Sequence, residues 1–161
     1  MIGGQPHHPL PVNPLEFEQL PDALRRRLAP RVERLGYLGA FFAYAAHQPD
    51  ALAGFVDYTE SLKGALPIDL SEIVALVVAS RLDNAYELVQ HQRLARHHGF
   101  DDHWIDMVMH RPAALDDARQ RATCELVEAT LARSGHDARP AFERLVACVG
   151  EADAIGVLLL I

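Results

Sequence analysis

The sequence predicts an all-α fold, and three observations support this. Apolar residues recur at steps of three and four, as in the segments 52–62 and 115–131. No segment alternates strictly enough between apolar and polar residues to predict a strand. Prolines stand near the starts of the apolar runs and glycines near their ends, which is the usual asymmetry of helix termini. We therefore expect helices joined by short turns.

The expected elements follow the chain in order. Residues 1–14 hold four prolines, which lack amide donors and fix φ, so this segment is expected to be an extended arm. The remainder, residues 15–161, is expected to be one helical domain, because half of the 161 residues are hydrophobic and can bury a core. Helices are predicted over residues 16–34, 37–46, 50–63, 70–81, 84–98, 102–109, 113–133 and 138–160.

Composition argues against several classes of function. The net charge is −7, and apart from Arg25, Arg26 and Arg27 the basic residues are scattered, so no nucleic-acid partner is expected. No leader-like start is present, and the longest apolar run, 154–161, is far shorter than the roughly 20 residues of a membrane span. A cytoplasmic protein without a membrane partner is the expectation.

The two cysteines, Cys124 and Cys148, do not form a Cys-x2-Cys pair, and both are expected to be buried, inert thiols. His97 and His98 adjoin Gly99 and are expected in the last turn of a helix, where imidazolium favours the helix dipole. Because no histidine combines with a carboxylate or a thiol at a known ligand spacing, no metal site is predicted.

The segment 72–91 is the strongest candidate for a site. A mostly apolar helical run carries Glu72 and then opens into Asn84, Tyr86, Glu87 and His91. Carboxylates and an imidazole beside so much hydrocarbon must find partners or change protonation. In one straight helix Glu72 and His91 would lie about 28 Å apart along the axis, at about 1.5 Å per residue.

Cooperation between Glu72 and His91 therefore requires a bend near residues 82–84. Asp83 and Asn84 are poor residues for a helix interior and good N-caps, so a new helix can start there. From that start Asn84, Glu87 and His91 share one helix face. A simpler interpretation stays open: Asn84-x2-Glu87 and Asp69-x2-Glu72 both match capping boxes, and His91 can be a core histidine.

The spacing also carries a family resemblance. Glu72, eleven residues, Asn84-x2-Glu87 and then x3-His91 reproduces the active-site pattern of alkylhydroperoxidase D, with both of that family's thiols replaced. Tyr86-Glu87, His91, Arg93 and Ala95 match the sister branch, the γ-carboxymuconolactone decarboxylases. The chain thus resembles the carboxymuconolactone decarboxylase family over roughly residues 20–100, with a weaker similarity in 150–161.

The resemblance implies an alkylhydroperoxidase D-like helical bundle that assembles as a homo-oligomer, a trimer or a hexamer. It also implies a lyase that decarboxylates a small cyclic carboxylate without a cofactor, since a conjugated lactone is its own electron sink. His91 would then be the proton donor, Glu72 and Glu87 would set its protonation, and Asn84 and Tyr86 would contact the substrate. The helix start at Asn84 could also hold an anion.

Two alternative functions stay open. One is a non-catalytic protein that keeps the fold and binds a small molecule; it would seal His91 by packing, whereas an enzyme would expose it in a cavity. The other is a thiol peroxidase, which is disfavoured because Asn84 and Glu87 stand where the reactive thiols would be.

Overall fold

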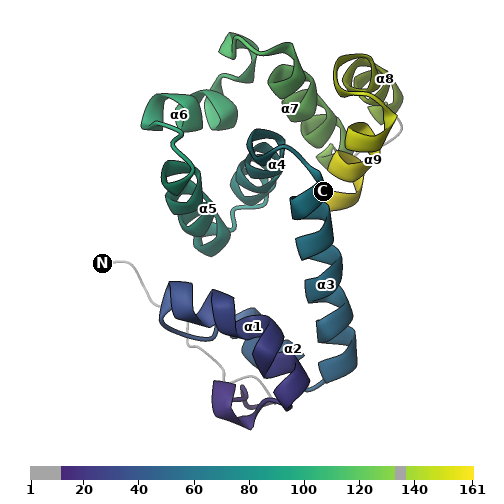
Figure 1. Ribbon diagram of the computed structural model, residues 1–161. Coiled ribbons are helices and arrows are strands. Elements are labelled where there is room, and N and C mark those ends of the chain that lie inside the picture. Colours follow the sequence, from purple (N-terminus) through teal and green to yellow (C-terminus); the bar gives the residue numbers. More distant parts are fainter. Residues whose placement is uncertain (1–11, 133–136) are drawn as a thin grey trace. The chain divides into compact units, whose positions relative to one another are not determined.

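The computed structural model describes residues 12–132 and 137–161, and every regular element in those ranges is helical (Figure 1). The all-α prediction is confirmed. Most of the expected arm, residues 1–11, lies outside the described residues, and 12–14 are not helical. The elements are η1 Phe17–Gln19, α1 Asp22–Leu35, α2 Ala40–Ala45, α3 Pro49–Ala65, α4 Ile68–Arg81, α5 Ala85–His97, α6 Asp102–His110, η2 Pro112–Ala114, α7 Ala118–Leu131, α8 Ala138–Val149 and α9 Glu151–Leu160.

The chain divides into two compact units, and the division falls inside α3, between Tyr58 and Thr59. Each unit has its own buried cluster of apolar side chains. In the N-terminal unit the cluster consists of Leu20, Leu24, Leu28, Ala46, Leu52 and Val56. The single domain predicted over residues 15–161 stays a prediction, since compactness by itself does not define a domain.

Helix α4 is the centre of the C-terminal unit, where α5, α6, α7 and α9 surround it (Figure 1). Its residues are buried on nearly every side, which explains why its sequence is apolar all round rather than along one stripe. Ser71 and Glu72 are the polar residues buried with it. A buried carboxylate in such an apolar helix is unusual.

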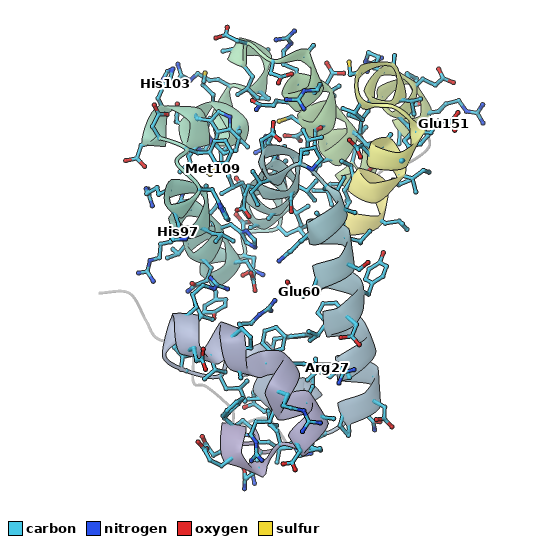
Figure 2. All side chains as sticks on the ribbon, in the orientation of Figure 1. Arg27, Glu60, His97, His103, Met109 and Glu151 are labelled. Atoms are coloured by element: carbon cyan, nitrogen blue, oxygen red, sulfur yellow. The ribbon has the colours of Figure 1, made fainter. Side chains whose placement is uncertain are left out.

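The side chains around α4 separate into inner and outer sets (Figure 2). Met109 of α6 lies toward the interior and is 8% exposed, whereas His97 of α5 and His103 of α6 lie on the outer surface. The indole of Trp104 stacks on Phe100 with ring centroids 4.1 Å apart. The core cluster of this unit therefore reaches from α4 out to α6.

Three predicted helices are interrupted. Residues 16–34 form η1 and α1, because Pro21 lies in extended backbone between them. Within the predicted helix 113–133, the described residues 113–132 form the end of η2, a short connection and α7, whose N-cap is Asp117. Residues 138–160 form α8 and α9, because Gly150 has φ 84° and ψ 170°, a conformation that residues with a Cβ rarely adopt. The sequence prediction was wrong at these three points.

The end of α5 follows the prediction. The helix finishes at His97, His98 is the C-cap, and Gly99 has φ 92°. Glycine adopts this left-handed conformation without the steric cost that a Cβ imposes, so it can stop the helix there. Within the described residues no helix combines the length and the apolar composition that crossing a bilayer requires.

Candidate functional site

The predicted bend is present between α4 and α5. Helix α4 ends at Arg81, and α5 begins at Ala85. Asp83 has φ 53°, the left-handed region in which aspartate is one of the better tolerated residues. The Asn84 amide donates to the Ala79 carbonyl at 2.9 Å, which closes the turn. The bend thus depends on local residues that the sequence already displayed.

The start of α5 is capped by one side chain. Asn84 Oδ1 accepts a hydrogen bond from the Glu87 amide at 3.2 Å, as an N-cap residue does. The Asn84 amide is already bonded to Ala79, and the Glu87 carboxylate lies near His91 instead. A capping box consists of two hydrogen bonds. The structure forms the one from the Glu87 amide to the Asn84 side chain, and the Asn84 amide bonds to Ala79 instead of to the Glu87 side chain.

The second capping box, at Asp69 and Glu72, is not formed. Asp69 lies inside α4, and its carboxylate accepts from Gln120 Nε2 at 2.8 Å and from Arg119 at 3.4 Å. Both partners come from α7, so Asp69 ties two helices together. This part of the capping interpretation was wrong, and Glu72 is left to bond elsewhere.

Glu72 and His91 meet across the bend. Glu72 Oε2 lies 3.0 Å from His91 Nδ1, with the Glu72 side chain 2% exposed and the His91 side chain 14% exposed. A buried carboxylate is costly unless it is paired, and in the described residues every buried polar side-chain atom has a hydrogen-bond partner. The structure therefore satisfies Glu72 with the one imidazole that the bend brings to it.

The other ring nitrogen of His91 has a weaker neighbour. Glu87 Oε2 lies 3.8 Å from His91 Nε2, one helical turn away, and the Glu87 side chain is 47% exposed. This distance is too long for a direct hydrogen bond. Nε2 is consequently the ring atom that remains for a ligand.

A partly open cavity of about 160 Å³ lies beside this pair. Its polar lining residues are Asn84, Glu87 and His91, all predicted site residues. The apolar lining residues are Val74, Ala75, Val78, Ala79, Leu82 and Leu160. Tyr86 is 46% exposed and does not line the cavity, so the structure does not bring this predicted substrate contact to the other site residues.

Sequence reasoning missed the apolar lining. The residues of α4 carry a usable signal, since 74, 78 and 82 follow the steps of one helix face next to the bend. Leu160 carries none, because it lies in another helix almost seventy residues away from His91. Only the packing of α9 against α4 places it in the wall.

The geometry determines which proton chemistry the pair can perform. An ionised carboxylate only accepts hydrogen bonds, so the His91 tautomer that bonds to Glu72 carries its hydrogen on Nδ1, and Nε2 is the ring nitrogen that Glu72 does not hold. The carboxylate also stabilises an imidazolium, as the buried aspartate does in catalytic triads. His91 can then accept a proton at Nε2 or return one there, which is general acid–base chemistry.

The two thiols differ from each other. Cys124 is buried in α7, and burial raises the pKa of its thiol to about 12, with the Glu128 carboxylate adding to the effect. Cys148 is exposed, so the expectation of two buried thiols was wrong for it. Within the described residues no three His, Cys, Asp or Glu side chains converge in a way that could hold a metal ion.

Arg81 is the basic residue nearest to the bend in the chain, and it is already paired. Its Nε donates to Glu128 Oε1 at 2.8 Å, and this bond raises the pKa of the guanidinium. Among the described residues, those that line the cavity include neither Lys nor Arg.

Comparison of the chain with protein-family models, with curated proteins and with solved structures finds no match.

Proposed function

We propose that this chain is a cofactor-free lyase of the carboxymuconolactone decarboxylase type, acting on a small cyclic carboxylate. The observation that carries the proposal is the Glu72–His91 hydrogen bond at the wall of a cavity that His91 also lines. The resemblance in spacing supports the same assignment, because the four residues that match the family pattern are the ones around this bend.

The reaction would proceed by loss of CO2 followed by protonation of carbon. The carbon–carbon bond to the carboxylate breaks, and its electron pair moves into the conjugated carbonyl of the ring. Protonated His91 then gives its Nε2 hydrogen to a ring carbon, and a proton from water restores the imidazolium. Throughout the reaction, Glu72 fixes the orientation of the His91 imidazole and stabilises its positive charge.

The charges at the cavity suit this order of events. The described lining residues supply no guanidinium or ammonium group, so the Asn84 amide group and the imidazolium hold the substrate carboxylate. Weak binding of the departing carboxylate avoids stabilising the ground state more than the transition state. Glu87, on the same helix face, adds negative charge that disfavours a tightly bound anion.

The alternative is a non-catalytic binding protein with the same fold. A cavity lined mainly by apolar residues would serve such a protein equally well. The exposure of His91 supports the enzyme, since 14% of its side chain is accessible and it lines the cavity instead of being sealed in the core. A thiol peroxidase is less well supported, because the high pKa of Cys124 keeps it a thiol.

The alkylhydroperoxidase D-like arrangement and the trimeric or hexameric assembly belong to the same proposal. Ile155 and Leu159 of α9 are 46% and 51% exposed, and exposed aliphatic side chains on one helix are typical of a surface that a subunit covers. Light scattering coupled to size-exclusion chromatography measures the assembly directly, and a monomeric mass at micromolar concentration would remove this part of the proposal.

The experiment that tests the proposal compares three proteins on a panel of carboxylated lactones and related cyclic acids. Ultraviolet absorbance follows the ring conjugation, and trapped CO2 confirms the reaction. We expect His91→Ala to lose about 10²- to 10⁴-fold in kcat, the usual contribution of a general acid. His97→Ala is the matched control, since His97 is an exposed histidine of the same helix. Undiminished turnover by a folded His91→Ala protein would refute the assignment.

A further inference from the structure

One residue that lines the cavity, Leu160, lies far along the chain from the other lining residues. Of the nine described residues that line it, eight lie between Val74 and His91, in α4, the bend and α5. The ninth is Leu160, in the last turn of α9. The polar side chains of the described lining therefore all come from the bend and α5, and Leu160 contributes only hydrocarbon.

Helix α9 is held in place by residues other than Leu160. Ala154 and Val157 are 0% exposed and belong to the core cluster of the C-terminal unit. A Cβ built on Gly156 would lie 2.9 Å from Leu66 Cδ2, so the helix backbone packs closely against Leu66 at that point. Because these contacts fix the helix, the side chain at position 160 can be changed while the wall around it stays in place.

The cavity has the size of one small ring. Its volume is about 160 Å³. In another protein an engineered apolar cavity of about 150 Å³ binds benzene. A five- or six-membered ring therefore fills this space, and the second ring of a fused pair has to extend through the open side of the cavity unless a wall side chain is shortened.

We propose that Leu160 is the specificity-determining residue that limits the ligand of this cavity to a single ring. The ring lies against α4 and Leu160, and its oxygen substituent faces His91 and Asn84, because the polar groups lie on the α5 side. The inference rests on the proposed function only in taking this cavity as the place where the substrate ring binds. Neutral rings test it without any catalysis.

The experiment measures the dissociation constants of phenol and 2-naphthol by ligand-observed NMR titration. The unmodified protein is expected to prefer phenol by about tenfold or more, since one excess or missing methylene changes selectivity in an apolar pocket by about 10- to 200-fold. Leu160→Ala removes Cγ and both Cδ atoms and is expected to reverse the preference. Leu158→Ala is the matched control, an exposed leucine of the same helix, and is expected to leave the ratio unchanged.

A second variant guards against a Leu160→Ala protein that does not fold. Leu160→Phe fills the cavity and is expected to lose phenol binding, with circular dichroism confirming the fold. An unmodified protein that binds neither ring, or a ratio that Leu160→Ala leaves unchanged or Leu158→Ala shifts equally, would overturn the inference. Turnover by His91→Ala separates the two proposals. If Leu160→Ala reverses the ring preference while His91→Ala keeps full turnover, the lyase proposal is refuted and the role of Leu160 is supported.

Discussion

The Glu72–His91 pair makes a quantitative prediction about stability. His91→Leu would leave the Glu72 carboxylate, 2% exposed, without its partner. Breaking a buried pair in this way costs about 3–5 kcal/mol, and the 14% exposure of His91 places this case near the lower end, at about 3 kcal/mol. For a chain of this length each kcal/mol corresponds to roughly 2–4 °C in Tm, so we expect a fall of about 6–12 °C.

The double variant separates the pair from simple loss of packing. The double variant Glu72→Met, His91→Leu replaces both polar groups by apolar side chains. Its free energy of unfolding is expected to lie within about 1 kcal/mol of that of the unmodified protein. The coupling free energy between the two positions should then reach about 2 kcal/mol or more. His97→Leu is the control and should change stability by less than about 0.5 kcal/mol, because His97 is exposed.

Urea denaturation followed by tryptophan fluorescence is a suitable assay. Trp104 is the only tryptophan of the chain, and it stacks on Phe100 in the C-terminal unit, which also holds Glu72 and His91. The signal therefore reports the unfolding of the unit that is changed. If the two single changes add within about 0.5 kcal/mol, the two side chains do not interact, and the structural basis of the proposed mechanism fails.

Two further predictions concern the caps and the thiols. Asn84→Ala and Asp101→Ala each remove the N-cap of a helix, and each should lower the free energy of unfolding by about 1 kcal/mol. Only Asn84→Ala should weaken phenol binding, because Asn84 lines the cavity and Asp101 does not. Equal effects of the two variants on phenol binding would contradict this. Iodoacetamide should label Cys148 but not Cys124 between pH 7 and 9, since raising the pH toward about 12 is needed to form the Cys124 thiolate. Mass spectrometry showing rapid native labelling of Cys124 would contradict its burial.

The bend between α4 and α5 could be predicted because its causes are local. Asp83 and Asn84 prefer turn and cap conformations over helix interiors, and the structure uses them for a left-handed residue and an N-cap. The meeting of Glu72 with His91 follows from that bend, since a buried carboxylate seeks a partner. The same kind of local reasoning placed the end of α5 at His97 and Gly99.

Other predictions were wrong because sequence patterns leave alternatives that distant contacts decide. Asp69 matches a capping box, but Gln120 and Arg119 of α7 offered it better partners, and this could not be read from residues 69–72. Gly150 was placed inside a continuous helix because the apolar pattern continues on both sides of it. The helices on either side of Gly150 also pack against each other, which only a break permits.

Residues 72–91 were enough to predict the helices, the bend and the candidate residues Glu72 and His91, because backbone preferences and capping act over three or four positions. Only the tertiary structure shows that Leu160 lines the cavity and that Cys148 is exposed. These outcomes depend on which face α9 and α8 turn toward the core. That choice minimises exposed apolar area over whole helices at once, so no short segment of the sequence contains it.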